Sequence, residues 1–223
     1  LNKTLEYALF KLGCFIKKIP SEDRAAWVND KFTEHAPHVL WDYVSYEGLF
    51  STLLMETAQF PIMDTILDGI STWQTRGGEV VNTIRSYKKT GFKNFSDYMR
   101  GKKASGEQDT SSSNGGVNAM AYGFLQYWNH GLTFPEIEGE FIVEGDDGDS
   151  QPHDRAPTAE DFRSIGFLAE VSEANSTAEA RFCQIVTTPE GQTLYNPLKF
   201  LAKLGKVDLK YARAGTKKLI ELV

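Results

Sequence analysis

The chain has 223 residues, of which 41% are hydrophobic and 12% aromatic, and its formal net charge is −6. This length and composition predict a globular protein of one sizeable domain, or a domain and a half, and no apolar run approaches the roughly 18 residues that span a bilayer. The N-terminus lacks the pattern of a secretory signal, and two cysteines without a CxxC pair exclude a disulfide framework. Because the first residue is Leu1 rather than Met, we expect a piece of a longer protein.

Charge is unevenly distributed along the sequence. Residues 136–179 contain thirteen acidic residues and two arginines, for a net charge of −11. Residues 76–103 and 199–218 each carry a net charge of +6. Two basic segments on either side of an acidic one suit a protein that holds phosphates at its rims and divalent metal ions at its centre. The alternative is that these segments are ordinary solvated faces, which composition alone favours.

The first third of the sequence predicts mainly helices. Helical spacing of apolar residues covers residues 1–16, 21–32, 49–60 and 62–73. Ser21 is a candidate cap for the second of these helices, and Pro61 should bend the chain between the last two. The apolar segment before them, "APHVLWDYV", indicates a buried strand that ends near Tyr43.

Short strands dominate the pattern after this helical region. Five segments are typical of strands: residues 80–84, 139–144, 167–171, 180–187 and 193–196. The second of them leads into an Asp147-Gly148 pair, which favours a hairpin.

Three further helices complete the predicted pattern. The polar residues 101–116 should form a loop that leads into an apolar helix ending near Trp128. Thr158, with Asp161 three residues later, should cap a helix over residues 158–167, and Pro197 should start a last helix. The order of elements predicts an α+β fold, with helices packed on one face of an antiparallel sheet.

Two aspartates stand at the ends of apolar strands. Asp42 ends "VLWD" and Asp146 follows "FIVEG", so carboxylates from neighbouring strands would converge and hold Mg²⁺ for phosphoryl or nucleotidyl transfer. Each aspartate alone is as well explained by a strand end, a cap or a solvated turn. A calcium loop starting at Asp147 fails, because Pro152 stands where the EF-hand needs its glycine.

The polar loop adds a third motif. "SGEQDTSSSN" has the spacing SG-x3-T-x3-N, and it lies between "DYVSYE" and "GDD". These three motifs in this order resemble the palm of viral RNA-dependent RNA polymerases. The resemblance extends through "GFLAEV" and "ARFCQIV", from Val39 to Tyr195. The FC pair is similar to the noda-like and tombus-like polymerases of positive-strand RNA viruses.

The resemblance implies a domain organisation. Residues 1–36 would be a helical N-terminal segment belonging to the fingers, and residues 37–196 the palm, with a fingers insertion at about 74–104. Residues 197–223 would begin the thumb.

The resemblance also implies site residues. Asp42 and Asp146 would be catalytic metal ligands with Asp147 as an auxiliary carboxylate, and the ion would be Mg²⁺, with Mn²⁺ as the alternative. The residues implied to bind nucleotide, template or ribose are Glu47, Ser105, Gly106, Thr110 and Asn114. Without the aspartates, an ordinary capped helix start would explain the last four of these equally well.

The sequence departs from the family pattern in three places. Glu47 replaces the usual second aspartate of the first motif. Glu170 stands where the fourth motif often has a lysine that protonates the leaving pyrophosphate, and Arg163 is the nearest preceding base. The 36 residues before Pro37 contain no basic fingers motif. These departures leave open a non-catalytic RNA-binding or replication-complex module on a degenerate palm, and a reverse transcriptase is a weaker alternative.

The implied function is template-directed transfer of nucleotides from NTPs to an RNA 3′-hydroxyl by a two-metal mechanism, in replication of a viral RNA genome. The implied partners are the RNA template and product duplex, NTPs and other viral replication proteins. We expect the host-cell cytoplasm, with membrane-associated replication complexes reached through regions outside this chain. We expect this chain alone to be inactive.

Overall fold

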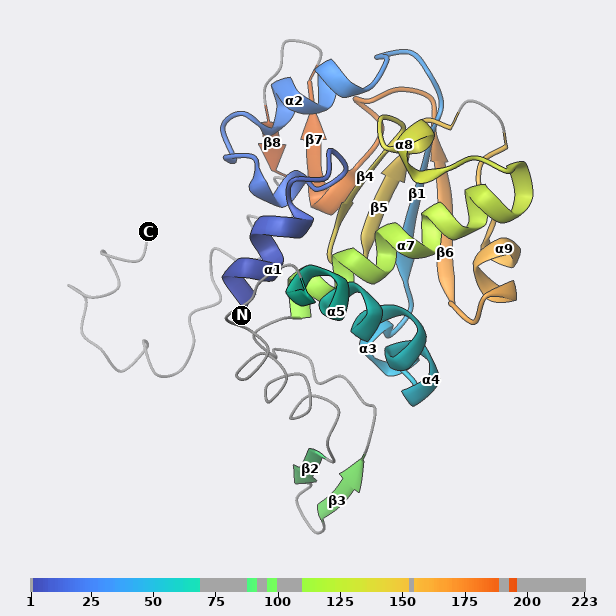
Figure 1. The fold of residues 1–223 in the computed structure, drawn as a ribbon. Helices are drawn as coiled ribbons and strands as arrows, with labels where there is room; N and C mark the ends of the chain where they lie inside the picture. Colours follow the sequence, from blue (N-terminus) through green and yellow to red (C-terminus); the bar gives the residue numbers. More distant parts are fainter. Residues whose placement is uncertain are drawn as a thin grey trace, which may run out of the picture.

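The computed structural model describes residues 2–68, 88–91, 96–99, 110–152, 155–188 and 193–195. They form a mixed α+β fold around a four-stranded antiparallel sheet (Figure 1). The helical segments are α1 Asn2–Leu9, η1 Ile16–Lys18, α2 Arg24–Lys31, α3 Tyr46–Leu49, α4 Thr52–Leu54, η2 Met55–Gln59, α5 Phe60–Asp68, α7 Thr110–His130, α8 Phe134–Ile137, α9 Ala159–Ser164 and η3 Phe182–Gln184. Within this part of the chain, no helix has the length and apolar character needed to cross a membrane.

The main sheet has the strand order β4-β5-β1-β6. Its strands are β1 His38–Tyr43, β4 Phe141–Glu144, β5 Asp147–Ser150 and β6 Ala169–Ala174. Since β5 pairs antiparallel with both β4 and β1, the strands β4 and β1 run in the same direction. Their carboxyl ends therefore meet at one edge of the sheet. The hairpins β2 Lys88–Gly91 with β3 Ser96–Met99, and β7 Ile185–Thr187 with β8 Thr193–Tyr195, lie outside this sheet.

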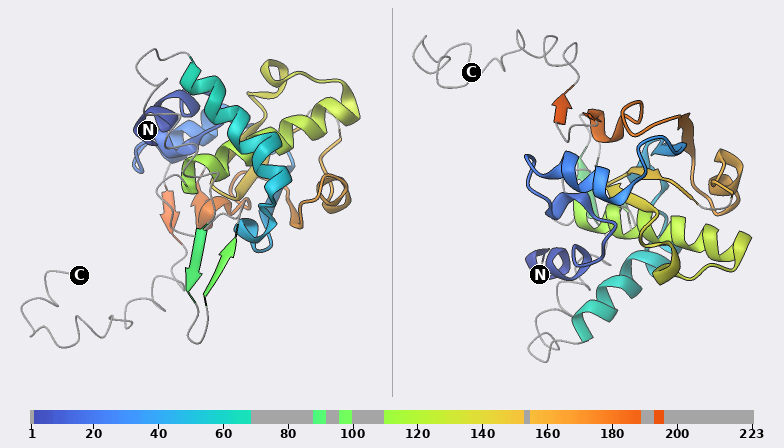
Figure 2. Two further views of the ribbon diagram at one scale, coloured as in Figure 1. Left: turned by 60° about the horizontal axis from the view of Figure 1, so that its bottom comes forward. Right: turned by 90° about the horizontal axis from the view of Figure 1, so that it is seen from above.

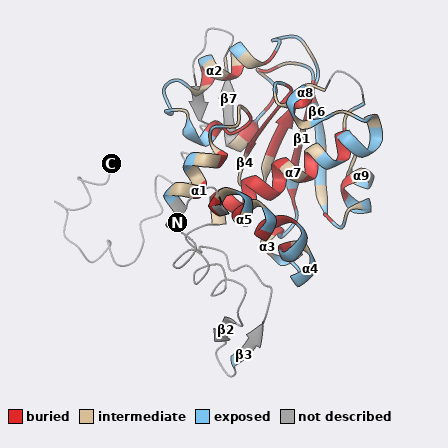
Figure 3. Ribbon diagram, in the orientation of Figure 1, coloured by how far each residue is buried: buried red, intermediate tan, exposed pale blue. Residues whose placement is uncertain are grey.

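One face of the sheet is covered by α7. The Trp41 ring stacks on Tyr122 of α7, with ring centroids 5.1 Å apart, and Tyr122 also contacts Phe141. Figure 2 shows α7 between the sheet and α5, and Figure 3 shows most of β1, β4 and β5 and the inner side of α7 as buried. The prediction of helices packed on one face of an antiparallel sheet is confirmed.

A smaller core covers the β4 end of the other face. Ile142 points away from α7 and packs with Val28 of α2 and Phe182 of η3. The face over β1 and β6 carries alternating polar residues instead, since Asp42 and Glu170 are both exposed. This half of the face borders an open pocket.

Several predicted boundaries are wrong. The first helix ends at Leu9 rather than at residue 16, and α2 begins at Arg24 after Asp23, without a cap from Ser21. The predicted loop over residues 101–116 is helical from Thr110, because Ser, Asn and Gly in this segment are buried against the core and tertiary packing outweighs their weak helix propensity.

Other predictions have different outcomes. Pro61 lies just after the π-helical segment η2, which runs directly into α5 through Phe60 in the αR conformation, so the chain stays helical through this position. The cap at Thr158 is confirmed, with its side chain accepting the N–H of Asp161 at 3.2 Å. The predicted strand at residues 80–84 and the predicted helix at Pro197 lie outside the described residues, as do most of the basic segments.

Candidate functional site

A tight hairpin turn presents the paired aspartates. Glu144 pairs with Asp147, so only Gly145 and Asp146 form the connection between β4 and β5. Gly145 has φ +65°, and a glycine at the first position of a two-residue connection is typical of a type II′ turn. The sequence predicted a turn at Asp147-Gly148, which is wrong, because both residues belong to β5.

Gly148 has a different purpose in β5. A Cβ atom at this position would overlap the indole ring of Trp41 on the neighbouring strand. The Trp41 ring therefore packs directly on the backbone of β5 at Gly148. This contact fixes the distance between β1 and the β4–β5 hairpin.

The carboxylates of the first and third motifs lie near one another in the structure. Burial and the nearby charges of Asp42 and Asp146 raise the pKa of Asp147 to about 6. Burial also raises the pKa of Asp146, with further contributions from the charges of Asp42 and Glu47. Aspartates that are far apart in the sequence thus lie close enough at this sheet edge to oppose each other's ionisation.

This donor set fits a hard divalent cation. Mutual repulsion among carboxylates is relieved by a cation between them, and carboxylate oxygens are the ligands that Mg²⁺ prefers. In the described part of the chain, no three His, Cys, Asp or Glu side chains are grouped so as to hold a metal ion. The described side chains therefore form no ready-made three-ligand site. A Mg²⁺ ion near Asp42, Asp146 and Asp147 would take most of its ligands from water and substrate phosphate oxygens.

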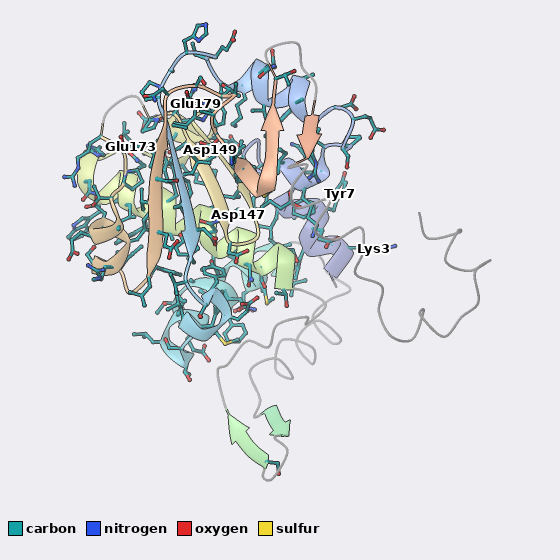
Figure 4. The ribbon with its side chains drawn as sticks, turned by 180° about the vertical axis from the view of Figure 1, so that it is seen from behind. Lys3, Tyr7, Asp147, Asp149, Glu173 and Glu179 are labelled. Atoms are coloured by element: carbon teal, nitrogen blue, oxygen red, sulfur yellow. The ribbon has the colours of Figure 1, made fainter. Side chains whose placement is uncertain are left out.

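An open pocket of about 520 Å³ adjoins these aspartates on the face away from α7. Asp42 and Asp147 line it together with Glu170, and Arg181 is the basic residue among its described lining. Figure 4 views the molecule from behind, with Asp147, Asp149, Glu173 and Glu179 labelled. The pocket is acidic at the aspartate edge and along β6.

Asp149, the third aspartate of the acidic motif, has a structural partner. It is 1% exposed, and its carboxylate lies 2.9 Å from Nδ1 of His38. The other ring nitrogen of His38 lies 3.1 Å from the Thr177 hydroxyl. Asp149 is therefore satisfied inside the protein and is separate from the half-buried Asp146 and Asp147.

Asn114 is buried in α7. It is 3% exposed, and its side-chain oxygen has no hydrogen-bond partner among the described residues. Its backbone oxygen accepts a hydrogen bond from the Tyr46 hydroxyl at 3.1 Å, which ties α7 to the segment carrying Glu47. A buried acceptor without a partner is costly unless a ligand supplies a donor.

Glu47 lies inside α3 and does not cap the helix that follows. The cap of α4 is Ser51, whose hydroxyl oxygen accepts the N–H of Leu54 at 3.1 Å. Glu47 instead contributes negative charge near Asp146. Glu47 therefore does not cap α4, and its charge lies near Asp146.

The remaining predicted site residues are only partly placed. Thr110 is the first residue of α7. Ser105 and Gly106 lie outside the described residues. Glu170 lies opposite Asp42 on β6, whereas Arg163 forms an exposed ion pair with Glu160. The ion-pair partner of Arg163 is therefore on its own helix, α9, and not among Asp42, Asp146 and Asp147.

Sequence reasoning missed Asn118. It lies one helical turn after Asn114 and is fully buried between α7, β1 and the hairpin turn. The available signal was an amide inside an otherwise apolar helix at the i+4 position. That signal does not reveal its partners, because they come from two strands distant in sequence.

Comparison with known proteins supports the fold. No protein-family model and no curated protein matches the sequence. The structure is similar to the RNA-dependent RNA polymerase of a human picobirnavirus, with a TM-score of 0.59 and 15% identity over 91% of this chain. An insertion-loop deletion mutant of such a polymerase matches with the same TM-score and identity over 90% of this chain.

The matched region is a part of those proteins. This chain spans 40% of the picobirnavirus polymerase and 41% of the deletion mutant. At this level of identity the similarity speaks to the arrangement of elements rather than to individual residues. The chain therefore has the fold of the polymerase domain found in viral RNA-dependent RNA polymerases.

Proposed function

We propose that this chain is the palm, with parts of the fingers and thumb, of a viral RNA-directed RNA polymerase. The observation that carries the proposal is the convergence of Asp42 with Asp146 and Asp147 at one edge of a polymerase-like sheet. The proposed reaction joins an NTP to an RNA 3′-hydroxyl and releases pyrophosphate. The domain division is proposed as 1–36, 37–196 and 197–223.

Each aspartate has a defined place in this reaction. Asp42 on β1 and Asp146 in the turn between β4 and β5 would hold Mg²⁺ or Mn²⁺, with Asp147 as the third carboxylate. When bound, such ions lower the pKa of the attacking hydroxyl and neutralise the phosphates. The rigid hairpin and β1 keep the carboxylates at a fixed separation, so that little reorganisation is needed when substrate enters.

The other motifs are proposed to bind the nucleotide and template. Asn114 is proposed to accept a hydrogen bond from the ribose 2′-hydroxyl. Glu47 is proposed to act with it, because the neighbouring Tyr46 hydroxyl bonds to the Asn114 backbone. Thr110, Ser105 and Gly106 are proposed to contact the incoming nucleotide and the template. RNA template, product duplex and NTPs are the proposed partners, together with other viral replication proteins.

The lineage and the location are separate proposals. Assignment to the noda-like and tombus-like polymerases rests on Phe182 and Cys183, whereas the similar structures come from a picobirnavirus. The proposed location is the host-cell cytoplasm, in replication complexes that reach membranes through regions outside this chain.

A second candidate function is a non-catalytic RNA-binding module. Glu170 favours it, because an acid opposite Asp42 stands where a proton donor for pyrophosphate would be useful. The two candidates differ in one measurable property, which is incorporation of nucleotides.

The test uses the full-length protein that contains this sequence. Primer extension on an RNA template with NTPs and Mg²⁺ should occur with the wild type and should be lost with Asp42→Asn. Glu160→Gln, which removes an exposed acid from α9, is the matched control and should leave extension intact. RNA binding by a folded wild-type protein that incorporates no nucleotide with Mg²⁺ or Mn²⁺ would establish the non-catalytic module.

A further inference from the structure

The side chain of Asn118 joins three elements. Its Nδ2 lies 3.2, 3.1 and 3.0 Å from the backbone oxygens of Gly145, Asp146 and Asp147. Its Oδ1 accepts hydrogen bonds from the Trp41 indole N–H at 2.8 Å and the Tyr43 hydroxyl at 3.1 Å. One buried amide therefore connects α7, the hairpin turn and β1.

The orientation of this amide follows from its partners. The Trp41 indole nitrogen can only donate, so the atom facing it must be the amide oxygen. The three backbone oxygens of residues 145–147 can only accept, so the atom facing them must be the amide nitrogen. With two acceptor bonds and two N–H groups directed at three carbonyls, the hydrogen-bonding capacity of Asn118 is fully used.

The turn needs such a connection because its ladder to β1 stops short. The pairing of β1 with β5 ends at Trp41 and Gly148. Residues 145–147 extend beyond this last pair, and their carboxylates repel Asp42 when no cation is present. Gly115 of α7 also lies close to the turn, since a Cβ placed there would be 3.6 Å from the backbone nitrogen of Gly145.

We propose that Asn118 is a positioning residue that holds the Gly145–Asp147 turn at a fixed distance from β1. This proposal rests on the proposed function, because the correct distance between the turn and β1 places the carboxylates of Asp42 and Asp146 where they can bind a cation. Asn118 acts through the backbone of the turn and through β1, and it does not touch the substrate. Its amide takes the place of the missing ladder pairs between the turn and β1.

Two variants of the full-length protein separate the two sides of this amide. Asn118→Asp keeps the size of the side chain and the oxygen facing Trp41, but it removes the donor to the turn. Tyr43→Phe removes one hydrogen bond on the β1 side and keeps the donor. The matched control is Tyr122→Phe, which removes a buried hydroxyl of α7 that has no hydrogen bond to the turn.

The first measurement is hydrogen exchange by mass spectrometry without added metal. Asn118→Asp should speed exchange in residues 144–149 about tenfold, while a peptide covering residues 159–164 stays unchanged. Tyr43→Phe should give a smaller increase in residues 144–149, and Tyr122→Phe none. This measurement does not depend on polymerase activity, so it tests the positioning role even if the proposed function fails.

The second measurement is the Mg²⁺ dependence of RNA synthesis. Asn118→Asp should raise the half-saturating Mg²⁺ concentration about tenfold, as losses outside the ligand set commonly do. If Asn118→Asp does not fold, Tyr43→Phe provides the test, and it should raise the half-saturating Mg²⁺ concentration by a smaller factor. Unchanged exchange at residues 144–149 in both folded variants, or a Mg²⁺ dependence equal to that of Tyr122→Phe, overturns the proposal.

Discussion

The two faces of the main sheet come from the same strands but differ in chemistry. On β1, Trp41 and Tyr43 point toward α7 and are buried, whereas Asp42 between them points the other way and is exposed. On β5, Gly148 faces Trp41, and Asp147 lies on the opposite side at the edge of the open pocket. Alternation along a strand places a packed core and a reactive edge one residue apart.

This difference teaches how the site is held in place. The buried face has stacked rings and a fully bonded amide, so its geometry is set by packing before any ligand arrives. The open face has like charges that repel one another and depends on the buried face for its spacing. Changes on the open face should therefore alter chemistry with little effect on stability, and changes on the buried face should do the reverse.

The largest expected effect comes from Asp146 on the open side. Asp146→Asn in the full-length protein should abolish nucleotide incorporation, because the lost charge serves the cation. The unfolding temperature should stay the same or rise, because one of several repelling carboxylates has become neutral. Primer extension and thermal unfolding measure the two properties. Extension by the mutant at a near wild-type rate with Mg²⁺ would show that the metal assignment is wrong.

The second effect concerns Gly148 on the buried side. Gly148→Ala places a methyl group into the Trp41 ring, so we expect a loss of about 3 kcal/mol in the free energy of unfolding, at the upper end for overpacked cores. Gly139→Ala is the control, since a Cβ there meets no atom within 4 Å. Denaturant unfolding of both variants provides the comparison. Equal stability of the two would mean that the sheet yields easily at this contact.

Part of the candidate site could be proposed from the sequence because the relevant signals are local. Asp42 and Asp146 were proposed from strand ends and Asn114 from the resemblance to polymerase motifs, and the structure places the charge of Asp42 near Asp146. The fold class was predicted from apolar periodicity and the order of elements. The fold class and the candidate aspartates could thus be predicted because their signals come from residues close together in the chain.

The parts that sequence did not predict depend on contacts between distant segments. The start of α7 at Thr110 depends on burial of a polar segment against the core, which local propensity does not express. The turn at Gly145 rather than at Asp147-Gly148 is selected by the fit of Gly148 under Trp41. Asn118 was missed for the same reason, since its five partners lie 27 to 77 positions away.

The third effect tests sugar selection at the boundary between the two faces. The buried side-chain oxygen of Asn114 has no hydrogen-bond partner among the described residues, so the ribose 2′-hydroxyl should donate to it, and dNTPs should leave it unpaired. Asn114→Ala should reduce the preference for rNTPs about tenfold, which corresponds to roughly 1.4 kcal/mol. Competition between rNTPs and dNTPs in the full-length protein measures this preference.

Glu47 sharpens this test. If Glu47 and Asn114 act on the same hydroxyl, Glu47→Gln combined with Asn114→Ala should lose no more preference than the worse single variant. Additive losses would mean that the two residues act separately. Unchanged preference in both single variants, with a lower unfolding temperature, would leave only a structural role for Asn114.

The smallest effect comes from Thr158, the N-terminal cap of α9. Phe162 of this helix packs against Trp41 on the buried face. Partial burial tends to raise the pKa of Asp161, but hydrogen bonds from the side chain and backbone N–H of Thr158 outweigh it, so the pKa lies below its ordinary value of 3.8. Thr158→Ala should cost about 1 kcal/mol at neutral pH. Because the folded pKa is lowered, the stabilisation exists above the unfolded pKa and is lost as the pH falls through the folded value. Denaturant unfolding should therefore show the difference between wild type and Thr158→Ala shrinking below about pH 4, while the rNTP preference stays constant. A changed rNTP preference in this variant would mean that the buried face controls chemistry as well as stability.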